Sequence, residues 1–205
     1  MKTSVINQRP EIWLFALAIL VANLTLLVGR VCEPLVYFPA QTFSGDWWRI
    51  LTYPLVHVSG YHLLLDAGAF LFLYHGLQAT SLRKRLIYMA GSAAGALLVS
   101  LSAESLCGLS GIAHGLMAIT GLEMMERSDS AARSAGTTCF SMIVLKSIYE
   151  ALSGHVAFEF LHLGSIGNAV AICHAGGIMG GLIVYALFRR RNRREEKTDA
   201  TYTDS

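Results

Sequence analysis

Six apolar stretches recur along this 205-residue chain, and they constrain its fold more than any other feature. Each reaches or approaches the roughly 20 residues that a helix needs to cross the hydrocarbon core of a bilayer. They are Ile12–Gly29, Tyr61–Leu77, Leu86–Ala103, Ser110–Met125, Thr137–Leu152 and Ala169–Phe188. Only 15% of the residues are charged, against about 25% in soluble domains. The sequence therefore predicts an all-α polytopic membrane protein with six transmembrane helices.

The distribution of lysine and arginine predicts the orientation, because these residues concentrate on the cytoplasmic side. With the N-terminus inside, the cytoplasm holds Lys2, Arg9, Arg83, Lys84, Arg85, Arg127, Arg133 and the tail "RRRNRREEK". The other side then holds only Arg30 and Arg49, within a long outer loop that ends near Gly60. We expect a cytoplasmic N-terminus over residues 1–11, a six-helix domain over 12–188, and a basic, disordered cytoplasmic tail over 189–205.

The four cysteines fit no zinc or redox spacing, and the chain has no HExxH motif, so we expect neither a metal nor a cofactor. Cys32 and Cys107 both fall near the outer face, where a disulfide could form. Unpaired thiols are the favoured interpretation.

Polar residues inside a membrane are costly, and here several fall at one depth. His57 and His62 precede or open the second stretch, with Asp66 one turn deeper. Ser110 opens the fourth stretch from the same side, and His174 lies about one turn into the sixth. Any one of them could be a packing residue satisfied within its own helix. Together they indicate a site near the outer face.

Glycine pairs predict how two of these helices meet. Gly111 and Gly115 form a GxxxG motif, as do Gly177 and Gly181, and this spacing lets helix backbones approach closely. His174 shares a face with the second pair, at i, i+3 and i+7. If the two glycine faces meet, His174 points at the serine that opens the fourth stretch.

Over close to its whole length, the sequence resembles the rhomboid family of intramembrane serine proteases. The likeness rests on "WWRILTYPLVHVSGYHLLLD" (Trp47–Asp66), "GLSG" (Gly108–Gly111) and "HAGGIMGG" (His174–Gly181). Order, spacing and topology together make it specific. The resemblance implies a six-helix fold and membrane-anchored protein substrates that have a transmembrane segment. The other partner is the lipid bilayer, and no nucleic acid is expected.

The resemblance also implies roles for single residues. Ser110 would be the nucleophile and His174 its general base, a dyad without an acid. His62 and the backbone N–H of Ser110 would stabilise the oxyanion, supported by the motif glycines Gly108 and Gly111. Trp48 and Arg49 would be structural residues of the outer loop.

Asp66 departs from the family pattern, which has an asparagine oxyanion donor there. An ionised carboxylate only accepts hydrogen bonds and would oppose the developing negative charge. Either Asp66 is protonated, or it pairs with His62 at i+4 and orients that ring, which is the interpretation we favour. A second ion pair, between Lys146 and Glu150, is expected on one face of the fifth helix.

His114 is the second peculiarity. The form "GLSGIAHG" in a minimal chain resembles the rhombosortase branch, bacterial enzymes that process the C-terminal GlyGly-CTERM tail of secreted proteins. That would place the chain in the bacterial inner membrane. His114 could itself pair with Ser110 at i+4, but His174 is the favoured base, which leaves His114 and His57 as cleft-lining residues. A general rhomboid protease and a catalytically inactive binder of membrane clients remain as alternatives.

Overall fold

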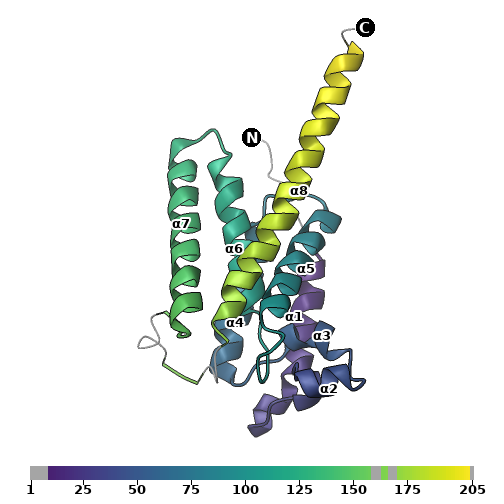
Figure 1. The fold of residues 1–205 in the computed structure, drawn as a ribbon, viewed down its shortest axis with the longest axis vertical. Helices are drawn as coiled ribbons and strands as arrows, with labels where there is room; N and C mark the ends of the chain where they lie inside the picture. Colours follow the sequence, from purple (N-terminus) through teal and green to yellow (C-terminus); the bar gives the residue numbers. More distant parts are fainter. Residues whose placement is uncertain (1–8, 158–162, 166–169, 204–205) are drawn as a thin grey trace.

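The computed structural model describes residues 9–157, 163–165 and 170–203, with side chains as far as residue 191. The described part of the chain is mostly helical and contains no strand. The long helices are α1 (Glu11–Ala22), α4 (Gly60–Gly76), α5 (Leu82–Val99), α6 (Ser110–Met125), α7 (Ser130–Ser153) and α8 (Ile172–Thr203). They run side by side as a bundle, and the end of α8 extends beyond it (Figure 1).

Short helices make up the loop between α1 and α4, which corresponds to the expected outer loop and lies at the opposite end of the bundle from the C-terminus (Figure 1). They are η1 (Leu24–Val28), η2 (Glu33–Leu35), α2 (Pro39–Phe43), α3 (Arg49–Thr52) and η3 (Tyr53–Leu55). The buried guanidinium of Arg49 donates to the backbone carbonyls of Glu33 and Val36 and to the carboxylate of Asp46. The indole N–H of Trp48 donates to a carbonyl of η2, 3.1 Å away. Both side chains therefore connect separate segments of this loop.

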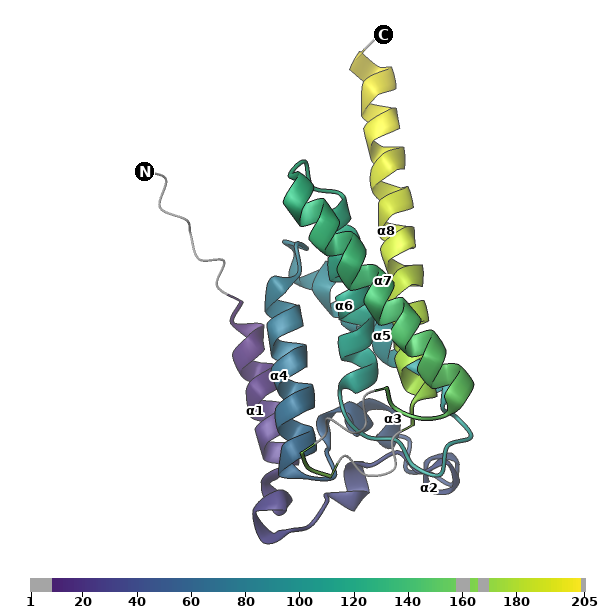
Figure 2. The same ribbon diagram turned by 90° about the vertical axis from the view of Figure 1, so that its left-hand side faces the viewer.

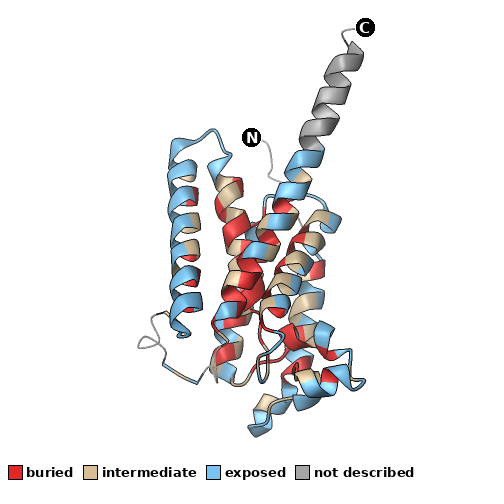
Figure 3. Cartoon of the chain, in the orientation of Figure 1, coloured by how far each residue is buried: buried red, intermediate tan, exposed pale blue. Residues whose placement is uncertain are grey.

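Helix α6 lies at the centre of the bundle and packs against α4, α5, α7 and α8, whereas α1 packs against α4 (Figure 2). Colouring by burial shows the same arrangement: buried residues concentrate on α6, and much of α7 is exposed (Figure 3). The first residue of α6 therefore lies where the surrounding helices converge.

Glycines bring α8 into backbone contact with two helices. A Cβ at Gly177 would lie 1.9 Å from the carbonyl oxygen of Gly111, and one at Gly115 would lie 2.5 Å from the carbonyl of Gly177. The predicted contact between the two GxxxG faces is therefore present. On its other side α8 meets α5, where a Cβ at Gly95 would lie 2.1 Å from the carbonyl of Gly176.

The observed bounds differ from the expected ones mainly where helices extend past their apolar segments. Helix α6 has the expected bounds, but α7 begins at Ser130 rather than at residue 137. Its first turns are small and polar, and the carboxylate of Asp129 caps them by accepting from two backbone N–H groups. In the same way α5 begins at Leu82, capped by the Ser81 hydroxyl. Hydropathy does not detect such polar first turns.

The expectation of a disordered tail was wrong for most of the tail. Helix α8 continues to Thr203, well past the apolar stretch that ends at Phe188. Arginine, lysine and glutamate have good helix propensity, and propagating an existing helix needs no new nucleation. The last two residues, 204–205, lie outside the described part.

Among the residues that the structure describes, length and composition alone qualify two helical segments to cross a membrane, Glu11–Val28 and Ile172–Arg191. A third qualifies if Arg49–Leu55 and Gly60–Gly76, bent by 96°, are counted as one span. Helices α4 and α6, with 17 and 16 residues, are shorter than the usual span, and α5 begins with charged residues. The six-span count therefore needs more than length and composition to support it.

Candidate active site

A cavity of about 450 Å³ opens between α4, α6, α7 and α8 at the end of the bundle near the outer loop. Its polar lining comes from all four helices: His62 and Asp66 of α4, Ser110 and His114 of α6, Lys146 of α7, and Cys173 and His174 of α8. Residues more than 100 positions apart in the sequence thus meet around one space.

Ser110 is the first residue of α6, and the turn before it requires glycine. Gly108 has φ +96°, and a Cβ there would lie 2.7 Å from Oδ2 of Asp66. The backbone N–H of Ser110 donates to that same oxygen, 3.0 Å away. Its hydroxyl oxygen lies 3.9 Å from the sulfur of Cys173 and lines the cavity. The serine is therefore available to a substrate and is rigidly placed by its backbone.

His174 is buried on α8, and its surroundings determine which of its nitrogens carries the proton. Nδ1 lies 2.7 Å from Oε2 of Glu150. An ionised carboxylate only accepts, so Nδ1 is the donor, and in the neutral ring Nε2 is the basic nitrogen. The hydrogen bonds of the described side chains include none between this ring and Ser110 Oγ. Such bonds are often formed only when substrate is bound.

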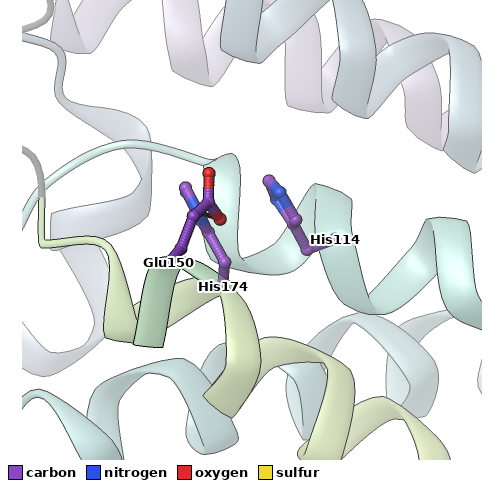
Figure 4. Close-up of side chains that lie close together, drawn as sticks. All are labelled: His114, Glu150 and His174. Atoms are coloured by element: carbon purple, nitrogen blue, oxygen red, sulfur yellow. Dashed lines mark hydrogen bonds and ion pairs between the residues drawn. The ribbon is translucent and has the colours of Figure 1, made fainter. Parts of the chain in front are cut away.

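His114 stacks on His174, with ring centroids 3.8 Å apart and planes 7° from parallel (Figure 4). Its Nδ1 lies 2.7 Å from the carbonyl oxygen of Ser110 and must donate to it. Its Nε2 lies 3.0 Å from the ammonium of Lys146, which can only donate. Both nitrogens of His114 are therefore occupied, and neither can take a proton from the serine.

Asp66 makes the predicted contact with His62 and one that was not predicted. Nε2 of His62 donates to Oδ2 of Asp66 at 3.1 Å, because its Nδ1 accepts from the N–H of Val58 at 3.4 Å. The same oxygen accepts from the N–H of Ser110. Asp66 thus occupies both of the donors that the resemblance assigns to an oxyanion.

His57 does not line the cavity, so its expected place in the cleft was wrong. It lies in the turn before α4, is fully buried, and packs edge-on against His62 with centroids 5.1 Å apart. Burial lowers the pKa of His57 to about 4, although Asp66, 3.7 Å from its Nε2, raises it in part.

The sequence did not predict the contact between Glu150 and His174. The predicted pair with Lys146 is present, but the other carboxylate oxygen binds His174. One signal was available, because Glu150 lies near the outer end of its apolar stretch, at the depth of His174. Spacing along the sequence instead favours Lys146, which offers a partner on the same helix.

Three potential metal ligands lie close together here, with donor atoms of His114, Glu150 and His174 within 4.8 Å of one another. The geometry suits a metal poorly. Lone pairs of two stacked parallel rings run side by side and do not converge on one ion, and the Lys146 ammonium already contacts both His114 and Glu150.

The expected cysteine state fits the structure, since Cys32, Cys107, Cys139 and Cys173 are all free thiols.

In a comparison with protein families, residues 44–191 match the model of the Rhomboid domain. The chain belongs to the rhomboid family. The matched region includes the outer-loop pair Trp48–Arg49, the serine of α6 and the histidine of α8. Searches of curated proteins and of solved structures found no match. Rhomboids are intramembrane serine proteases that act on transmembrane substrates, so this rhomboid is a membrane protein of a protease family.

Proposed function

We propose that this rhomboid is an intramembrane serine endopeptidase with Ser110 as nucleophile and His174 as general base. The observation that carries the proposal is the state of His174. Its Nδ1 is committed to Glu150, which leaves Nε2 basic in a cavity that Ser110 also lines. His114 cannot compete for the role, since both of its nitrogens are engaged.

The reaction follows from these positions. The hydroxyl of Ser110 attacks a peptide carbonyl and gives its proton to Nε2 of His174, which then protonates the leaving amine. The resulting acyl-enzyme is released by water or by another acceptor. His62 and the N–H of Ser110 stabilise the oxyanion once Asp66 releases them.

The proposed topology has six spans, with both termini in the cytoplasm and the cavity on the outer side of a bacterial inner membrane. A basic cluster supports this orientation. Arg9 and Arg85 lie at the end of α4 and the start of α5, where Arg9 donates to the carbonyls of Tyr74 and Leu77. That is the end of the bundle opposite to the cavity, as the lysine and arginine rule requires.

The substrate we propose is the C-terminal GlyGly-CTERM tail of secreted proteins, cut near the outer end of its transmembrane segment. The support is "GLSGIAHG", whose His114 stacks directly on the proposed base. Mass spectrometry of secreted proteins tests it, comparing cells that contain the wild type with cells that contain Ser110→Ala. Intact tails only in the mutant support the substrate. Tails processed equally in both overturn it and leave a general rhomboid protease.

Proteolysis itself is tested separately. The purified chain is reconstituted in liposomes with a model protein whose transmembrane segment has glycines near its outer end. Cleavage by the wild type but not by Ser110→Ala supports the proposal. A Ser110→Ala variant that cleaves as well as the wild type contradicts it. Binding without cleavage by the wild type would favour the inactive client binder.

A further inference from the structure

Glu150 has an environment that a simple ion pair does not need. Its side chain is completely buried on α7, facing α6 and α8. Oε1 accepts from the ammonium of Lys146 and from the backbone N–H of Ala157, 2.9 Å away. Oε2 is directed to Nδ1 of His174 at 2.7 Å (Figure 4). Each oxygen thus has its own partners, and Oε2 accepts the hydrogen bond from His174.

Burying a carboxylate costs free energy unless charged donors surround it. Lys146 alone could form an i, i+4 pair with Glu150 at the edge of the bundle, where water would lower that cost. Here the carboxylate instead lies between helices, and Lys146 itself is drawn in by a second contact to His114. The contact between Glu150 and His174 is therefore part of how α7 packs against α6 and α8.

We infer that Glu150 is a positioning residue, the acid of a Ser110–His174–Glu150 triad, and this inference rests on the proposed function. Glu150 holds His174 in the tautomer with a basic Nε2. It also stabilises the imidazolium that forms when the serine proton moves to Nε2. The proton remains on the imidazole until the leaving amine takes it, and the carboxylate stays ionised throughout.

The rest of the cluster fixes the same ring. His114 covers one face of His174 and is itself held by the Ser110 carbonyl and by Lys146. Across the cavity lie His62 and Asp66 of α4 and the thiol of Cys107. A dyad relies on packing alone to orient its imidazole, whereas this chain adds a charged hydrogen bond from a third helix.

The test is cleavage kinetics of the full chain in liposomes, with Glu150→Gln compared with Glu123→Gln. Glu123 is the matched control: it is also a buried carboxylate, but it lies at the far end of α6 and accepts from the N–H of Gln78. We expect Glu150→Gln to lower kcat by about 10²- to 10⁴-fold with KM changed less than about threefold. Glu123→Gln should keep kcat within about threefold of the wild type. An unchanged kcat in Glu150→Gln overturns the inference, as does an equal loss in the control.

A double-mutant cycle separates positioning from mere stability. If Glu150 acts through His174, then Glu150→Gln slows fluorophosphonate labelling of Ser110 in the wild type but adds nothing in the His174→Ala background. An additive loss contradicts the inference.

Further variants keep the inference testable if Glu150→Gln does not fold, and they separate its failure from failure of the proposed function. If Glu150→Gln does not fold, Glu150→Asp keeps the charge but draws it back from His174 by one methylene. It should lose at least about tenfold in kcat, and full activity would overturn the inference. Should Ser110→Ala or His174→Ala remain active, the proposed function fails. If both are inactive while Glu150→Gln is active, only the role of Glu150 fails.

Discussion

Replacing Asp66 with asparagine should make the enzyme faster. In the structure one oxygen of Asp66 accepts from the N–H of Ser110 at 3.0 Å and from Nε2 of His62 at 3.1 Å. These are the donors that the developing oxyanion needs. The introduced asparagine side chain would be neutral, and its amide could donate to the oxyanion instead of repelling it.

The magnitude follows from the charges. An oxyanion about 4 Å from an ionised carboxylate is repelled by about 4 kcal/mol at an effective dielectric constant near 20. Losing the charged hydrogen bonds that orient His62 costs about 1.5–3 kcal/mol in the opposite direction. The net gain is about 1–2.5 kcal/mol, or roughly 5- to 70-fold in kcat/KM.

The assay is cleavage in liposomes across a range of pH. The reasoning is refuted if Asp66→Asn is slower than the wild type by a constant factor at every pH. It is also refuted if neither the rate nor the pH profile changes.

Three further predictions concern stability. Gly177→Ala should lower the melting temperature sharply and abolish activity, because its Cβ would lie 1.9 Å from the carbonyl of Gly111, whereas Gly68→Ala, with nothing within 4 Å, should melt like the wild type. His57 is buried in its neutral form, so the unfolded chain binds its proton more readily than the folded one. Stability in detergent should therefore be full above about pH 6.5 and fall towards pH 4, and His57→Gln should flatten that slope. Arg49→Lys keeps the charge but cannot reach the same set of carbonyl and carboxylate acceptors, so limited proteolysis should cut the outer loop faster than in the wild type. An unchanged cutting rate would exclude this role for the guanidinium.

Much of the fold could be predicted from the sequence because apolar length and glycine spacing are local signals. The bounds of α6 and the meeting of its glycine face with that of α8 both follow from such signals. The polar first turns of α7 and the charged end of α8 were missed because neither is apolar. Capping and helix propensity, not hydropathy, determine those segments.

The site was predictable only in part, for a different reason. Family motifs and a shared depth brought Ser110, His62 and His174 together. The bond from Glu150 to His174 depends on the rotation of α7 about its own axis, and Lys146 offered the carboxylate an equally good local partner. A contact between helices that competes with one inside a helix cannot be ranked from spacing alone.

The most direct test of the central claim is labelling of Ser110 by a fluorophosphonate probe in native membranes. We expect one labelled serine in the wild type, identified as Ser110 by peptide mass spectrometry. We expect no labelling in Ser110→Ala, almost none in His174→Ala, and clear labelling in His114→Ala. Labelling that survives in His174→Ala and is lost in His114→Ala would contradict the account and transfer the role of base to His114.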